Sequence, residues 1–123
     1  MNDFEIIYAY SRADAIADGV LIDVTNMAVE AGFRFPVALT CSAWNACIYV
    51  DPKCEHQDEE GRLWDVLMIL KLSIPRHTDT SSISFKVLFA DGTGRQAEAS
   101  LKAICGPGDD EEPVITIMLP DED

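Results

Sequence analysis

Basic residues are scarce in this sequence. Its 123 residues include nine Lys and Arg against 22 Asp and Glu, which gives a formal net charge of −13 at pH 7. Because like charges repel, this balance disfavours direct binding to nucleic acid or to an anionic membrane. It favours association with basic surfaces, and the most available of these in a cell are surfaces that hold DNA or RNA. Solubility alone is the alternative explanation for the negative charge.

Histidine is rare too, since the chain contains only His56 and His77. Both lie in polar loop sequence outside any recognisable nucleophile motif, so a Ser–His or Cys–His active site is not indicated. A zinc site would need cysteines at C-x2-C spacing, and the spacing of Cys41, Cys47 and Cys54 differs from it. We therefore predict no metal, no cofactor and no catalytic residue. Cys41 and Cys47 are expected to pack as small apolar side chains.

The chain also lacks a long apolar run. The longest apolar-rich segment, residues 63–74, is interrupted by Asp65, Lys71 and Ser73 and is shorter than the roughly 18 residues that a membrane-spanning helix needs. The opening residues MNDFEIIYAY have neither the basic region nor the long apolar region of a secretory leader. We expect a cytoplasmic protein with reduced thiols and no membrane partner.

The first half of the chain contains repeated signals for short helices. The length suits a single domain, residues 1–123. Ser11 and Thr25 are candidate N-caps, and glycines that suit a left-handed helix end follow each of the two segments. Thr40 can cap a third helix in CSAWNACIYV, which places Trp44, Cys47 and Ile48 on one face. We predict three short helices in this half.

The second half contains signals for strands. Residues 63–74 are nearly continuously apolar, and their length and their Leu and Met content favour a helix over a strand. Alternating apolar residues at 83–89 and 97–105 flank the turn sequence DGTG, which predicts a β-hairpin. VITIML is apolar on both faces and is predicted to be an interior strand. The predicted fold is α+β, with a helical N-terminal half packed on an antiparallel sheet built mainly from the C-terminal half.

The acidic stretch GPGDDEEPVITIMLPDED, residues 106–123, is the main functional candidate. It cannot be a phosphate-binding loop, which needs bare backbone N–H groups and a lysine, and its acids do not alternate as in a calcium-binding EF-hand. Carboxylates on an extended segment can approach the charge spacing of a DNA strand, about 3.4 Å. The candidate partner-binding residues are Asp109, Asp110, Glu111, Glu112, Asp121, Glu122 and Asp123.

Three other carboxylates lie beside apolar residues. Burial of Asp23, Asp65 or Glu98 would raise the pKa of that side chain and suit it to acid–base catalysis. Asp65 is the most interesting of the three, and local pairing with Arg62 or simple exposure to water is its favoured alternative. These residues are therefore weaker candidates than the acidic stretch.

Four segments together resemble a family of small bacterial proteins carried on plasmids, phages and other mobile elements. They are YSRADAIADGVLIDVT, EAGFRFPVALT, GRLWDV and CGPGDDEEPVITIMLPDED. The family implies no catalytic residues, but it does imply a setting in which small acidic proteins frequently inhibit host defence, as anti-CRISPR and anti-restriction proteins do. The leading hypothesis is therefore a non-enzymatic inhibitor, with DNA mimicry as its candidate mode of action, that binds a basic, nucleic-acid-handling surface of a host defence complex.

Two alternatives stay open. IIYAYSRADAIADGVLIDV resembles the start of ADP-ribosyltransferase-like domains, although the histidine expected in the first strand is absent. Alternatively, the protein is a structural or assembly component of the element and forms a homodimer through residues 63–72.

Overall fold

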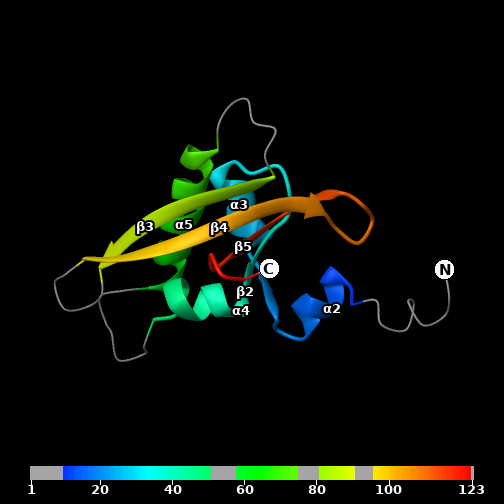
Figure 1. The fold of residues 1–123 in the computed structure, drawn as a ribbon, viewed down its shortest axis with the longest axis horizontal. Coiled ribbons are helices and arrows are strands. Elements are labelled where there is room, and N and C mark those ends of the chain that lie inside the picture. Colours follow the sequence, from blue (N-terminus) through cyan, green and yellow to red (C-terminus); the bar gives the residue numbers. More distant parts are fainter. Residues whose placement is uncertain (1–9, 51–57, 75–80, 91–95, 123) are drawn as a thin grey trace.

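The structure is a computed structural model that describes residues 10–50, 58–74, 81–90 and 96–122. It combines helices with a five-stranded sheet, so the α+β prediction is confirmed (Figure 1). In chain order the elements are α2 (Arg12–Ala17), β1 (Leu21–Asp23), α3 (Thr25–Ala31), β2 (Val37–Thr40), α4 (Cys41–Ala43), the π-helix η1 (Trp44–Ile48), α5 (Glu59–Ser73), β3 (Ser82–Ala90), β4 (Gln96–Pro107) and β5 (Pro113–Met118).

The sheet has the strand order β1-β2-β5-β4-β3. β5 pairs with a strand on both sides, which confirms that VITIML is an interior strand. β2 and β5 run parallel, with Val37 opposite Ile115, so the sheet is mixed and the prediction of an antiparallel sheet is wrong for this pair. Parallel neighbours need a long crossover, and the connection from β2 to β5 includes α4, η1, α5 and the β3–β4 hairpin.

β3 and β4 form the predicted hairpin. They pair antiparallel from Ser82 opposite Ile104 to Ala90 opposite Gln96. In β3 the alternation sends Phe85 and Val87 into the core, while the intervening residues are exposed. The hairpin is therefore confirmed, and the DGTG residues of its turn lie outside the described ranges.

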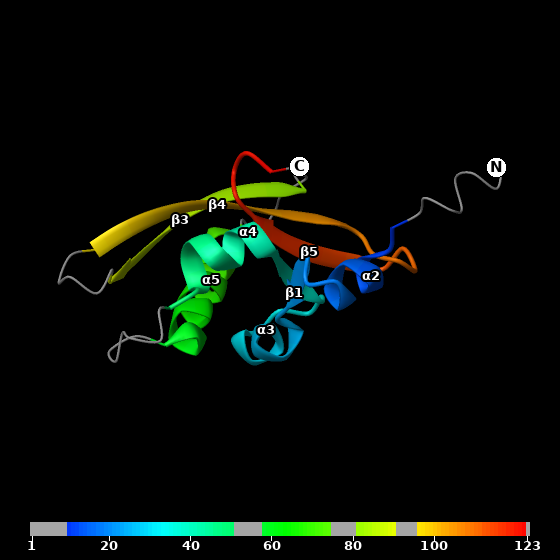
Figure 2. The same cartoon turned by 90° about the horizontal axis from the view of Figure 1, so that it is seen from below.

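One face of the sheet carries the main core. α3 and α5 lie on the same side of the sheet (Figure 2). The ambiguous run is a helix, as predicted, and its Leu67 and Leu70 are fully buried among the inward side chains of the strands. α5 begins after Asp58, whose carboxylate accepts from the Gly61 N–H. No helix in the described ranges is long and apolar enough to cross a membrane.

The short helices follow most of their sequence signals. The Asp14 N–H donates to Ser11 Oγ at 2.9 Å, as predicted for an N-cap. Gly19 and Gly32 end their helices with φ of 80° and 100°, a left-handed conformation that favours glycine. At Gly32 a side chain would also collide with Lys71, whose Nζ donates to the Ala31 carbonyl at 2.8 Å.

Thr25 does not cap α3 as predicted. The N-cap is Val24, and it makes no side-chain capping bond. The Thr25 hydroxyl instead donates to the Asp23 carboxylate and accepts from the Val37 N–H at 3.1 Å. The prediction fails because β2 lies beside this turn and its backbone takes the hydroxyl that would otherwise cap the helix.

The third predicted helix is present, but it begins as an α-helix and continues as a π-helix. Thr40 caps it as expected, since its Oγ1 accepts from the Ala43 N–H at 3.1 Å. α4 then passes into the π-helix η1, in which the Tyr49 N–H donates to the Trp44 carbonyl at 2.9 Å. Cys47 is buried in the predicted apolar face, whereas Cys41 is exposed. The expectation for Cys41 is wrong because it is the first residue of α4, and the core receives residues from the following turns.

α2 lies against one part of the second face of the sheet, whereas Lys86, Leu88 and Glu98 on the same face are exposed. Side chains alternate along a strand, so Thr116 and Met118 point away from the core that holds Ile117. The Arg12 guanidinium of α2 donates to Thr116 Oγ1 at 2.7 Å, which places α2 on that second face. Ala38 of β2 also points to this face and is fully buried there. In Figure 2, β1 lies between α3 and α2, as this arrangement requires.

Candidate functional site

Asp109 joins the acidic loop to the start of α2. Its Oδ1 accepts from the Arg12 N–H at 2.7 Å, and its Oδ2 accepts from the Ala13 N–H at 3.0 Å. The N–H groups in the first turn of a helix have no hydrogen-bond partner within the helix. A carboxylate at the helix N-terminus accepts from them and is stabilised. These backbone hydrogen bonds lower the pKa of Asp109 below its usual value. Both oxygens of Asp109 are therefore engaged within the protein.

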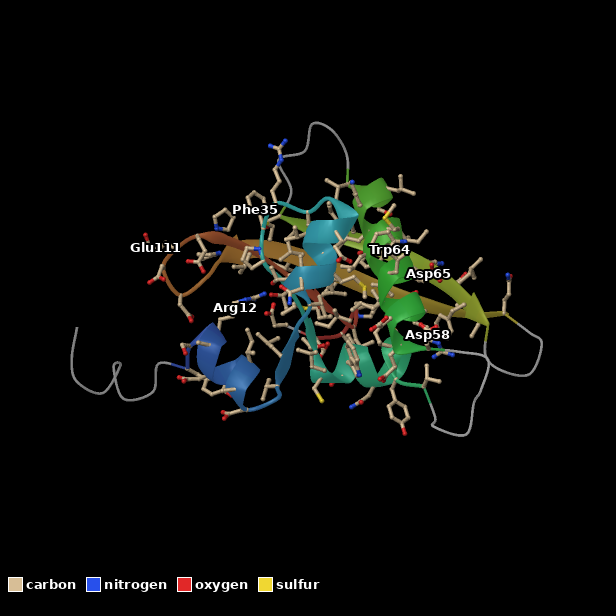
Figure 3. The ribbon with its side chains drawn as sticks, turned by 180° about the vertical axis from the view of Figure 1, so that it is seen from behind. Arg12, Phe35, Asp58, Trp64, Asp65 and Glu111 are labelled. Atoms are coloured by element: carbon tan, nitrogen blue, oxygen red, sulfur yellow. The ribbon has the colours of Figure 1, made fainter. Side chains whose placement is uncertain are left out.

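The other acids of the loop divide into two groups. Glu112 Oε2 accepts from the Asp110 N–H at 2.9 Å, and the Gly108 N–H donates to the Glu112 carbonyl at 2.6 Å. These bonds close a tight turn in which Glu111 has a φ of 65°, uncommon for a residue other than glycine. The side chains of Asp110 and Glu111 are exposed, and Glu111 lies at the outer tip of the loop (Figure 3). The loop thus presents two carboxylates while two others hold its shape.

Arg12 lies behind this loop. Besides its bond to Thr116, its Nη2 donates to the Ile115 carbonyl at 3.0 Å. Burial lowers the pKa of the Arg12 guanidinium, and the neighbouring carboxylates Asp23, Asp109 and Glu112 oppose this shift. Sequence reasoning missed Arg12. The available signal was that it is the only Lys or Arg before Arg34.

Glu122 holds the C-terminal segment against β2. Its Oε2 accepts from Thr40 Oγ1 at 2.7 Å and from the Leu119 N–H at 2.8 Å. Asp121 is exposed, and Asp123 lies outside the described residues. The predicted contact residues thus fall into two sets. Within the described ranges, the exposed side chains of Asp110, Glu111 and Asp121 accept no hydrogen bond. The side chains of Asp109, Glu112 and Glu122 each accept one or more.

A cleft of about 490 Å³ lies between α2, the ends of β2 and β5, and the C-terminal turn. β2 and β5 are parallel, so their carboxyl ends meet at one edge of the sheet, a common location for ligand sites. Ala15, Leu21 and Met118 contribute apolar surface, and Asp18 and Glu122 contribute carboxylates. This cleft was not predicted, because its walls come from segments far apart in the sequence.

Tyr10 and Cys41 also line the cleft. Tyr10 Oη donates to Asp18 Oδ2 at 2.7 Å, and this hydrogen bond raises the pKa of Tyr10. The Cys41 thiol is exposed at the start of α4, where it accepts a weak hydrogen bond from Asn45 Nδ2 at 3.5 Å. The cleft therefore combines an apolar surface with hydroxyl, thiol and carboxylate groups.

The three carboxylates proposed for acid–base work are not buried. Asp23, Asp65 and Glu98 are all exposed, so none of them has the buried environment on which that role depends. Asp23 accepts from Thr25, and Glu98 pairs with Lys86 at 3.5 Å on the sheet surface. Asp65 lies on the exposed side of α5 (Figure 3).

The candidates for zinc and nucleophilic chemistry fall largely outside the described chain. Cys54, His56 and His77 belong to the ranges that the structure does not describe. Among residues 10–50, 58–74, 81–90 and 96–122, no group of three or more His, Cys, Asp or Glu side chains is placed to hold a metal ion. The first strand expected for an ADP-ribosyltransferase-like domain, before Tyr10, also lies outside the described residues.

The apolar run proposed as a dimer surface is used mainly by the protein's own core. Leu63, Val66, Leu67 and Leu70 are buried, whereas Trp64 and Leu72 are exposed on α5. The exposed side chains are too few to make the whole run an interface.

We expect the contribution of Asp109 to stability to depend on pH. Because its pKa is lower in the folded protein, this contribution is fully present above the unfolded value near 3.8 and is lost as the pH falls through the folded value. Asp109→Ala is thus expected to lower the melting temperature at neutral pH, with the difference from wild type shrinking below pH 4. Thermal unfolding followed by circular dichroism across this range measures it. A difference that is constant with pH would contradict the role assigned to the carboxylate.

Comparison with known proteins identifies the family of the chain. Comparison with curated proteins and with solved structures found no match in either set. One family model, described as a Family of unknown function (DUF6573), matches residues 1–123, which is the whole chain. On this match the chain belongs to the Family of unknown function (DUF6573).

Proposed function

We propose that this protein is a non-enzymatic binding protein that docks an acidic end onto a basic, nucleic-acid-handling surface of a partner protein. The acidic end is defined by the exposed carboxylates of Asp14, Asp110 and Glu111. The observation that carries the proposal is that the four acids of the loop differ in their hydrogen bonding. All four side chains are exposed, but Asp109 and Glu112 hold the loop conformation through hydrogen bonds, whereas Asp110 and Glu111 accept no side-chain hydrogen bond from the described residues.

Preorganisation makes these carboxylates more useful for binding than acids on a loose tail. A loop that is already hydrogen-bonded loses less conformational entropy when a partner binds. Arg12, whose charge lies beside Asp109, donates its side-chain hydrogen bonds inward to β5, so it does not offer its charge to a partner. The outward field at this end is therefore negative, and it favours rapid encounter with a basic surface.

The finer proposal concerns the partner. Resemblance to proteins of plasmids and phages supports a host defence complex, because small acidic proteins of such elements frequently inhibit host defence. A CRISPR effector or a restriction enzyme offers the required Lys- and Arg-lined groove, and the acidic end would occupy it in place of nucleic acid. This part of the proposal is an analogy between settings.

Affinity capture tests the proposal. The intact protein, immobilised in a lysate that contains CRISPR and restriction systems, is expected to retain a defence nuclease. With the retained complex, the double variant Asp110→Asn/Glu111→Gln is expected to slow association about tenfold at low salt, and raising the salt is expected to shrink the difference. Association rates are measured by surface plasmon resonance.

A matched control carries the same change in charge elsewhere. Glu30→Gln/Asp65→Asn removes two exposed carboxylates from α3 and α5, on the other side of the sheet from α2. This control is expected to bind at close to the wild-type rate. Equal slowing by both double variants would show that net charge, and not the acidic end, determines the association rate. Capture of no nucleic-acid-handling protein would reject the proposal.

A further inference from the structure

The cleft beside α2 has the two properties that a long basic side chain needs. Ala15, Leu21 and Met118 provide apolar surface for an aliphatic stem, and Asp18 and Glu122 provide negative charge for its head. No Lys or Arg is among the described residues that line it. Its volume of about 490 Å³ is within the usual range of ligand pockets.

Each of the two carboxylates has one oxygen engaged and one available. Tyr10 Oη occupies Asp18 Oδ2, and Thr40 Oγ1 with the Leu119 N–H occupies Glu122 Oε2. Within the described ranges, Asp18 Oδ1 and Glu122 Oε1 accept no hydrogen bond. The internal bonds therefore orient both carboxylates and leave an acceptor on each.

The two acceptors come from separate segments of the chain. Asp18 ends α2, and Glu122 belongs to the C-terminal turn. A guanidinium group carries five N–H donors in a planar fork and can donate to two such acceptors together, whereas an ammonium group is a compact point charge. Tyr10, in the same cleft, adds an aromatic side chain of the kind that attracts guanidinium groups.

We infer that this cleft is a binding site for a guanidinium group on an aliphatic chain, namely an arginine side chain of the basic partner. The inference rests on the proposed function for the identity of the partner. It deepens that proposal, because Asp18 lies on the same helix as Asp14 of the acidic end. The acidic end directs the encounter, and the cleft takes one arginine of the docked surface.

Titration of the isolated, ¹⁵N-labelled full chain tests the site without any partner. The probe is a short peptide, acetyl-Gly-Arg-Gly-amide, and the control peptide contains citrulline, which has the same shape without the charge. We expect the arginine peptide to shift the backbone amide signals of Asp18, Thr40 and Glu122 and to saturate in the low-millimolar range. Equal shifts with the citrulline peptide, or shifts that never saturate, would overturn the site.

Variants separate the cleft from general negative charge. Asp18→Asn keeps an oxygen that can accept from Tyr10 but removes the charge, and it is expected to weaken arginine-peptide binding about tenfold. Glu30→Gln removes one exposed charge from α3 but does not line the cleft, so it is expected to bind the peptide like wild type. The same NMR spectra verify that both variants are folded. Equal weakening by the two variants would contradict the inference.

Two further arms identify the source of the guanidinium group and separate the two proposals. Agmatine carries the same group as a free small molecule, and binding of agmatine without binding of the peptide would overturn a partner arginine as the occupant. Capture of a basic partner that depends on Asp110 and Glu111, together with no peptide binding, would reject the cleft alone. Peptide binding without capture of any basic partner would support the cleft and reject the proposed function.

Discussion

Replacing Leu67 with alanine is expected to cost about 2 to 5 kcal/mol of the free energy of unfolding. Leu67 is 0% exposed and lies in the core between α5 and the sheet, so the substitution removes buried methyl groups and leaves a cavity. A domain of this size has a total stability of about 5 to 15 kcal/mol, so the loss is a large share of it. Equilibrium unfolding in urea measures the change as a lower midpoint with an unchanged slope.

Leu72 provides the matched control on the same helix. It is 77% exposed, and Leu72→Ala deletes the same atoms with the same change in helix propensity. Its expected effect is within about 0.5 kcal/mol of zero. Equal losses for Leu67→Ala and Leu72→Ala would mean that α5 is covered on both sides. A Leu72 effect that grows with protein concentration, together with a dimer in light scattering, would instead support the homodimer alternative.

Replacing Arg12 with alanine has the second largest expected effect, about 1 to 3 kcal/mol of unfolding free energy. The substitution removes two side-chain hydrogen bonds to β5 and the positive charge beside Asp23, Asp109 and Glu112. The backbone N–H bonds from Arg12 and Ala13 to Asp109 are retained, so the variant isolates the side chain. We expect faster hydrogen exchange in α2 in addition to the lower urea midpoint.

Two further variants test whether the effect of Arg12→Ala comes from the lost hydrogen bonds or from the lost charge. Arg12→Lys keeps a positive charge but cannot reproduce the fork that reaches both Thr116 and the Ile115 carbonyl, so it is expected to recover only part of the loss. Arg34→Ala removes an exposed arginine and is expected to change stability by less than about 0.5 kcal/mol. Full recovery by Arg12→Lys would show that charge alone, and not hydrogen-bond geometry, places α2.

Local signals predicted the secondary structure well. The Ser11 and Thr40 caps, the two glycines at helix ends and the alternation in the β3–β4 hairpin all act between residues a few positions apart or within one strand. Such interactions are readable from a single sequence because the partners are near neighbours in the chain. Thr25 is the exception, since its hydroxyl bonds to Val37, twelve residues away, instead of capping its own helix.

The parallel pairing of β2 with β5 was not predicted for a different reason. Both strands are short and apolar, and an apolar strand of this kind fits an antiparallel or a parallel neighbour equally well. The choice depends on how the intervening helices and hairpin pack against the sheet. That packing also brings the carboxyl ends of β2 and β5 together and forms the cleft.

The acidic loop shows where sequence and tertiary structure divide. The sequence by itself determined that negative charge concentrates in residues 109–112, because composition is independent of folding. Asp109 and Asp110 are chemically identical neighbours, and only the fold gave them different roles. α2 meets the loop across 97 residues of chain, so its free N–H groups occupy the Asp109 carboxylate, whereas the equally exposed Asp110 carboxylate accepts no hydrogen bond from the described residues. A long-range hydrogen bond has no local sequence signal, and the tertiary structure alone decided which carboxylates remain available to a partner.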